Sequence, residues 1–459
     1  MKKIISFFFV LITFLFCVFP NSLDDDCAYL ETLFSDVAID MSLSLDEKKL
    51  TAKDVITEIK TTYKETASSK KEKKEGIDKK AFASAISKIY AKYSNTCGHT
   101  SVSNVTGDDF FMPFTHQYIY YSDIYFTKEN DSYVVYKNYK NIKKGMRYTG
   151  NVDNIFKTIH DEQTLFTFGT FSSGFLKTSI ISIDDNKDYE IPVAGSMGKV
   201  KNSKDYDFKK IDNSIYLKIE KCNFSDESKE KQFLDDSKNI IKEFSKADNI
   251  IFDLRDNLGG FSKYVNQFLC ALIYDEQTNE NDLEFNKWHT SLYAGEKRIN
   301  TKTMIDKTVS KGLAPSSYIN FCRENLETKY LDDVEDEEIT LFPYFKGKIY
   351  VIMNPLTCSA AEEFVLNLKE IFDQNVITIG QNSQGGLDFT DVYKYVLPNS
   401  KIRLKLCAVD MRDSKLLTNK YWLGDTKGIY PDYWCKPNDV VKILSFLMGN
   451  ESMSDYIKL

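Results

Sequence analysis

Short apolar runs rich in β-branched residues alternate with helical patterns in the second half of the chain. Strands are expected at residues 215–219, 250–254, 349–353 and 376–379. Helices are expected at about 227–246, 263–273 and 359–372. Strands that alternate with helices form an α/β core with crossover connections. We therefore expect an α/β domain over residues 203–459, interrupted by an insertion at 275–340 whose acidic end favours a surface position.

The residues before this domain show two other patterns. Residues 23–105 carry apolar side chains at helical spacing, for example Leu30, Leu33 and Phe34, so we expect a helical N-terminal cap. Within it, the lysine-rich run at 68–80 is expected to be a solvated linker or helix face. Residues 106–202 change to short aromatic and β-branched runs broken by Asn, Asp and Gly, which indicate a β-rich module.

The first residues have the pattern of a secretory signal peptide. Lys2 and Lys3 precede an apolar run of 16 residues at 4–19, and an acidic stretch follows at 24–26. The alternative is an uncleaved anchor, but the run is shorter than the roughly 20 residues that span a bilayer. We expect residues 1–22 to be removed, which leaves no stable membrane span and a secreted or lumenal protein. Four glycosylation sequons fit this route, at Asn104, Asn130, Asn223 and Asn450.

Charge and cysteine usage exclude several kinds of partner and site. The net charge is −7 and the basic residues are dispersed, so no patch for nucleic acid is expected. No C-x-x-C motif is present, so the sequence supports neither a zinc site nor a redox motif. Eight cysteines follow the signal peptide, at 27, 97, 222, 270, 322, 358, 407 and 435. An even number permits disulfides in an oxidising compartment, but neither their pairing nor the oligomeric state can be read from the sequence.

Two strand-to-helix turns in the α/β domain carry residues suited to acyl transfer. One ends in Gly259 and Gly260, which can expose backbone N–H groups to an oxyanion. The other places Ser359 at the start of a helix, with the N–H of Ala360 pointing to the same space. Each turn also has a plainer interpretation, because paired glycines often only turn the chain and Ser359 can form a capping box with Glu362.

Two further residues are candidates for the nucleophile and the base. Cys358 is a rival nucleophile, but its side chain is expected to face away from that of Ser359 and to pack as a small buried residue. His99 lies far away in the sequence, and a single histidine is more often structural than catalytic. Its role therefore depends on the other motifs.

Taken together, these stretches resemble the C-terminal processing (tail-specific) serine peptidases, in particular their tricorn-protease-like branch. The resemblance rests on four motifs in the family's order, at 253–260, 359–362, 379–385 and 428–432. It implies a crotonase-like (ClpP/crotonase-type) α/β core that acts on a peptide or protein substrate without a metal or cofactor. It also implies that residues 141–193 are a degenerate PDZ-like module, to which a generic β-rich spacer is the alternative.

The resemblance also assigns roles to individual residues. Ser359 matches the nucleophile, and the N–H groups of Ala360 and of Gly259 or Gly260 match the oxyanion hole. The other branch of the family has a lysine base within a Gly-Lys-Gly segment. This chain has glutamine and two glycines there, at 384–386, so no lysine matches.

The missing lysine favours His99 as the general base, as in the tricorn-like branch. That branch completes a tetrad with a serine before the histidine and a later glutamate, where this chain has Gly98 and Asp425. The orienting relay is incomplete unless a neighbouring hydroxyl or a water substitutes. We expect a secreted or lumenal serine peptidase that forms an acyl-enzyme on Ser359. The alternative is a catalytically inactive peptide- or ligand-binding protein on the same scaffold.

Overall fold

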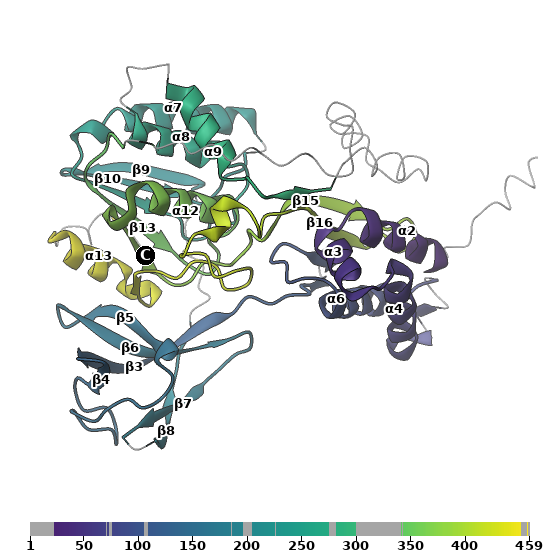
Figure 1. Cartoon of the computed structure of the whole chain (residues 1–459), viewed down its shortest axis with the longest axis horizontal. Helices are drawn as coiled ribbons and strands as arrows, with labels where there is room; N and C mark the ends of the chain where they lie inside the picture. The colour runs from purple at the N-terminus through teal and green to yellow at the C-terminus, as the bar shows by residue number, and fades with distance from the viewer. Residues whose placement is uncertain are drawn as a thin grey trace, which may run out of the picture. The chain divides into compact units, whose positions relative to one another are not determined.

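The computed structural model describes most of the chain after residue 22 (Figure 1). Residues 1–22, 70, 73–75, 105–108, 185, 196–203, 225, 275–280, 300–340, 342, 451–456 and 458–459 are not described. The predicted signal peptide and most of the predicted insertion lie outside the described residues. Among the helices of the described part, none is long and apolar enough to cross a bilayer.

A six-stranded sheet forms the centre of one compact unit, with the strand order β17-β14-β13-β11-β10-β9. Its strands are β9 (Tyr206–Ile211), β10 (Ser214–Ile219), β11 (Asn249–Asp253), β13 (Lys348–Met353), β14 (Val376–Gly380) and β17 (Tyr433–Trp434). All neighbours are parallel except β9, which is antiparallel to β10. The four strands predicted from the sequence are all present, with ends that differ by one residue at most.

Helices cover both faces of this sheet. Successive strand residues point to opposite sides, and buried apolar residues on each side pack against helices. The ring of Phe252 contacts Phe268 of α8 (Lys263–Ile273) and Phe364 of α12 (Ala360–Phe372), at centroid distances of 6.1 and 4.9 Å. The next residue in the strand, Ile251, belongs to the core cluster of α13 (Val440–Met448). Figure 1 shows α13 across the sheet from α7 (Glu227–Ile241) and α8. The mixed α/β architecture predicted from the alternating pattern is therefore confirmed.

Residues 118–192 of the same unit are β-rich. An antiparallel sheet of order β4-β3-β6-β5 and a separate hairpin of β7 and β8 make up this region. The strands are β3 (Tyr118–Glu129), β4 (Ser132–Val135), β5 (Ile155–His160), β6 (Gln163–Ser172), β7 (Thr178–Ile183) and β8 (Lys187–Pro192). Phe126, Phe168 and Ile181 are buried in a common cluster, so the sheet and the hairpin share one core.

The second compact unit combines the N-terminal helices with a distant part of the chain. Its helices are α2 (Leu23–Asp36), α3 (Ile39–Lys48), α4 (Ala52–Thr66) and α6 (Lys79–Tyr93). Its strands are β1 (Ser101–Ser103), β2 (Phe110–Phe111), β12 (Lys297–Arg298), β15 (Phe389–Val396) and β16 (Arg403–Asp410). Thr51 and Asp54 form a capping box at the start of α4.

Residues 389–410 join this unit although the sequence places them inside the predicted α/β domain. β1 pairs antiparallel with β16, so that Ser101 lies opposite Lys405. Leu30 and Phe34 of α2 share a hydrophobic cluster with Leu404 and Leu406 of β16. Strand pairing over such a separation leaves no local pattern, so the sequence alone does not predict it.

The described part of the predicted insertion contains β12 and the helix α9 (Asn281–Ser291). His289 Nε2 of α9 lies 2.9 Å from Glu363 Oε1 of α12. This contact attaches the insertion to the helix that follows Ser359.

Candidate active site

Ser359 lies at a strained turn between β13 and α12. Its backbone has φ 56° and ψ −124°, a conformation that is costly for a residue with a side chain. Such strain is concentrated at functional sites, and a sharp strand-to-helix turn exposes a nucleophile at the start of the helix. The neighbouring Cys358 is buried, and burial raises the pKa of its thiol well above the ordinary value. Because the thiolate is the reactive form, this environment favours Ser359 over Cys358 as the nucleophile.

The glycine turn lies directly against Ser359. A Cβ atom on Gly259 would stand 2.6 Å from the Ser359 Cβ and 3.0 Å from the Ala360 nitrogen, so only glycine fits there. The N–H of Gly259 donates to Asn257 Oδ1 at 2.9 Å, so this donor is already engaged within the glycine turn. Within the described part of the chain, the N–H groups of Gly260 and Ala360 have no hydrogen-bond partner. These two amides are therefore the candidates for an oxyanion hole.

Glu362 connects the Ser359 turn to the loop at 383–386. Its carboxylate accepts hydrogen bonds from the N–H groups of Ser359, Gly385 and Gly386 at 2.8, 2.7 and 3.0 Å, and from Ser383 Oγ at 2.5 Å. Burial raises the pKa of Glu362 to about 7, although these four donors favour the ionised form. The bond to the Ser359 N–H belongs to the predicted capping box, so the structural and functional interpretations of this turn are compatible.

His116 supports the same loop, although it is not among the site residues predicted from the sequence. Its Nδ1 lies 2.6 Å from the carbonyl oxygen of Gln384, and the Gln384 N–H donates to the Thr357 carbonyl at 2.8 Å. Burial lowers the pKa of His116 to about 4, so the ring is neutral at physiological pH. No motif surrounds His116 in the sequence, and only the tertiary contact with Gln384 identifies it.

Asp425 belongs to the same unit as Ser359 and is buried. Its Oδ1 accepts hydrogen bonds from the N–H groups of Leu387 and Asp388, both at 2.8 Å. Its own N–H donates to Asp388 Oδ2 at 3.0 Å. Asp425 therefore holds the backbone immediately before Phe389.

His99 belongs to the other unit, just before β1. Its Nδ1 lies 2.9 Å from the carbonyl oxygen of Phe389. A carbonyl oxygen only accepts, so Nδ1 carries the proton and Nε2 is left as the acceptor. Burial lowers the pKa of His99, the Phe389 carbonyl opposes this effect, and the charge of Lys405 lowers the pKa further. His99 is therefore neutral at physiological pH, as a general base must be.

Two exposed apolar side chains flank the glycine pair. Leu258 is 61% exposed and Phe261 is 60% exposed. The Phe261 ring lies 6.5 Å from that of Tyr264, which in turn lies 5.1 Å from the half-buried ring of Phe224. An apolar surface therefore begins beside the turn that contacts Ser359.

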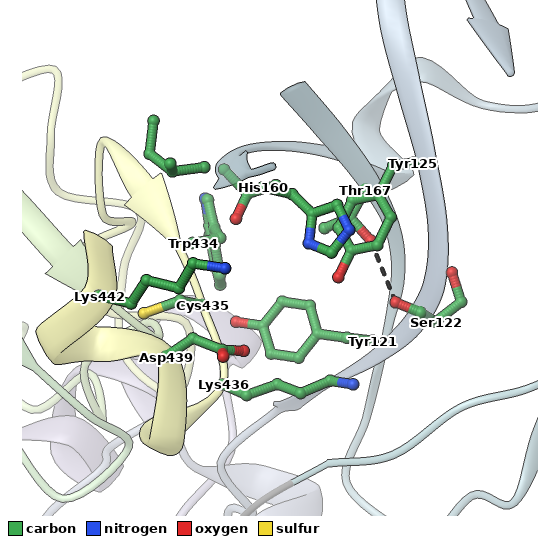
Figure 2. Close-up of a pocket in the computed structure, with 12 residues that line it drawn as sticks. Tyr121, Ser122, Tyr125, His160, Thr167, Trp434, Cys435, Lys436, Asp439 and Lys442 are labelled. Atoms are coloured by element: carbon green, nitrogen blue, oxygen red, sulfur yellow. Dashed lines mark hydrogen bonds between the residues drawn. The ribbon is translucent and has the colours of Figure 1, made fainter. Parts of the chain in front are cut away.

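A small cavity lies elsewhere in the same unit. It has a volume of about 30 Å³ and is lined by residues of β3, β5 and β6 together with residues 434–442. Figure 2 shows Tyr121, His160 and Lys442 around it. It has room for about two water molecules, and none of the predicted site residues lines it. Among the described residues, no group of His, Cys, Asp and Glu is arranged to hold a metal ion.

Part of the chain matches the model of a known protein family. Residues 214–434 match peptidase family S41, a range that includes both turns and Asp425 but not His99. A search of the curated proteins found no match.

Several solved structures are distantly similar. Mature CPAF complexed with lactacystin is 12% identical with a TM-score of 0.41, covering 94% of this chain and 95% of that chain. A putative peptidase from Parabacteroides merdae ATCC 43184 is 13% identical with a TM-score of 0.39, covering 94% and 98%. The photosystem II D1 C-terminal processing protease is 11% identical with a TM-score of 0.37, covering 94% and 99%.

Proposed function

We propose, from the match of residues 214–434 to peptidase family S41, that the chain is a serine peptidase in which Ser359 hydrolyses peptide bonds through an acyl-enzyme. The observation that carries the proposal is the contact between the strained Ser359 turn and the glycine turn. It supports an oxyanion hole made of the N–H groups of Gly260, in the glycine turn, and Ala360, in the Ser359 turn, which have no hydrogen-bond partner among the described residues. Preorganised amides of this kind stabilise the tetrahedral oxyanion of acyl transfer.

In the proposed reaction, His99 Nε2 withdraws the Ser359 proton while the hydroxyl oxygen attacks the peptide carbonyl. The amides of Gly260 and Ala360 hold the oxyanion, and protonated His99 then gives its proton to the leaving amine. Water, deprotonated by His99, releases the acyl group in the second half of the reaction. Cys358 takes no part, because its thiol is buried.

Asp425 is proposed to orient His99 through the backbone. The family resemblance places Asp425 where the tricorn-like branch has the glutamate of its tetrad. Two hydrogen bonds support a path through the backbone, since Asp425 accepts from the N–H of Asp388 and the next residue, Phe389, accepts from His99 Nδ1. A fixed carbonyl would maintain the tautomer in which Nε2 is the base. This path would offset the missing hydroxyl at Gly98.

We propose a crotonase-like core, a helical cap at 23–105 and a degenerate PDZ-like module within 106–202, supported by the mixed sheet, the N-terminal helices and the β-rich region. The pattern at residues 1–22 supports a secretory route. Intact-mass analysis of the secreted protein tests this route, and a mass that retains residues 1–22 would contradict it.

Reaction with a fluorophosphonate probe tests the proposed function. The probe is expected to label Ser359 of the native chain and to leave Ser359→Ala unlabelled, because only an activated serine attacks it. If the folded native chain stays unlabelled, the inactive peptide- or ligand-binding protein becomes the better account.

Substitution of Gly259 tests the contact between the two turns. Gly259→Ala is expected to lower peptide hydrolysis on the order of 10²-fold or more, because the added methyl collides with Ser359 and displaces the oxyanion donors. Gly145→Ala is the matched control, since Gly145 has a similar φ of 88° but no atom within 4 Å of an added Cβ. Initial rates on a fluorogenic peptide measure both variants. Near-native activity of Gly259→Ala would contradict the proposed oxyanion hole.

The exposed apolar surface predicts a substrate preference. Peptides with a large apolar side chain next to the scissile bond are expected to be cleaved about tenfold faster than peptides with serine there, because that side chain packs on Leu258 and Phe261. Phe261→Ser should reduce this ratio severalfold. Phe175→Ser is the control, because Phe175 is 79% exposed in the β-rich region. An unchanged ratio in Phe261→Ser, with activity retained, would disprove the preference without affecting the nucleophile assignment.

A further inference from the structure

Two thiols meet in the unit that contains the N-terminal helices. Cys97 Sγ and Cys407 Sγ lie 3.4 Å apart, although 310 residues separate them in the sequence. Both side chains are 0% exposed and belong to the hydrophobic cluster that α2, α6 and β16 share. Their contact is therefore set by the packing of this unit.

The thiol pair lies next to the proposed general base. Cys97 is two residues before His99, and Cys407 Sγ donates to the Phe389 carbonyl oxygen at 3.6 Å. His99 Nδ1 donates to the same oxygen at 2.9 Å. The thiol and the imidazole thus share one acceptor.

The backbone around the pair is already held in register. β1 begins at Ser101, four residues after Cys97, and Ser101 lies opposite Lys405 in β16. A bond between the two sulfur atoms would add a covalent link between the same two segments, just before the short β1 strand begins. It would secure the segment that carries His99 to β16.

We propose that Cys97 and Cys407 form a disulfide when the chain folds in an oxidising compartment. The two thiols lose two protons and two electrons, an S–S bond forms, and the disulfide of an oxidoreductase or of oxidised glutathione is reduced to two thiols. The sulfur atoms must approach by about 1.4 Å to reach the bond length of about 2.05 Å. Because both side chains are buried, the bond forms during folding, before the core closes. The Cys407 thiol then no longer donates to the Phe389 carbonyl oxygen, which still accepts from His99 Nδ1.

Peptide mapping of the full chain, produced through a secretory pathway, tests the proposal. Free thiols are alkylated in denaturant without reductant, and the digest is analysed by mass spectrometry before and after reduction. The expected result is a linked pair of peptides containing Cys97 and Cys407, which separates on reduction. Alkylation of both cysteines before reduction, or linkage of either one to a different cysteine, would overturn the proposal.

Thermal unfolding provides a second measurement. Dithiothreitol is expected to lower the Tm of the native chain by about 5 to 10 °C more than that of Cys97→Ser or Cys407→Ser, because those variants lack the cross-link. Cys435→Ser is the matched control, since Cys435 is a buried cysteine of the other unit and its variant should respond like the native chain. An equal response of the native chain and both variants would contradict the proposal. If a variant does not fold, the peptide map of the native chain still decides. Neither measurement depends on the proposed peptidase function.

Discussion

Replacing Ser359 by alanine is expected to lower kcat/KM for a fluorogenic peptide on the order of 10³-fold or more, and His99→Ala is expected to cost as much. The losses are similar because the proposed nucleophile and base act as one unit, and removing either leaves only the oxyanion donors. Asp425→Asn should cost less, because the asparagine Oδ1 can still accept from the N–H groups of Leu387 and Asp388.

The same assay gives a control and a pH profile. His160→Ala should retain activity, since His160 stacks on Tyr125 in the β-rich region. Activity should rise with pH as His99 loses its proton. Because burial lowers the pKa of His99, this rise should lie below the ordinary histidine value of about 6.5. Near-native activity of His99→Ala, or a rise well above that value, would remove His99 from the proposed mechanism.

Loss of the Glu362 carboxylate is expected to have the largest effect on stability. Glu362→Ala should lower the free energy of unfolding by about 3 to 5 kcal/mol, because four donors around a buried carboxylate lose their acceptor. Denaturant unfolding measures this change. Glu230→Ala is the control and should change stability little, since that carboxylate binds Lys263 at the surface. Equal stability of the two variants would contradict the role of Glu362 in holding the loop.

The raised pKa of Glu362 also predicts a pH dependence. Its pKa is about 7 in the folded protein and near 4.5 when unfolded, so the folded state holds the proton more tightly. The resulting stability is present below pH 4.5 and is lost as pH rises through about 7. The free energy of unfolding of the native chain should therefore fall by about 3 kcal/mol relative to that of Glu362→Gln between pH 4 and pH 8. A constant difference would show that the carboxyl does not titrate in this range.

The sequence alone determined four of the six strands of the central sheet and the two turns. Strand and helix periodicity is a local property, so the ends of β10, β11, β13 and β14 could be predicted within one residue. A turn is also specified by the few residues within it, so the glycine pair and Ser359 could be named as candidates from the sequence. The sequence could not show which glycine amide remains unpaired, because that depends on the bond from Gly259 to Asn257.

Only the tertiary structure decided which distant segments meet. It placed residues 389–410 with the N-terminal helices and brought Cys97 next to Cys407. It also showed that His116 supports the 383–386 loop and that His99 Nδ1 binds a backbone carbonyl. These contacts follow from strand pairing and burial between segments hundreds of residues apart. Such pairings depend on how the whole core packs, and neither periodicity nor motif spacing predicts them.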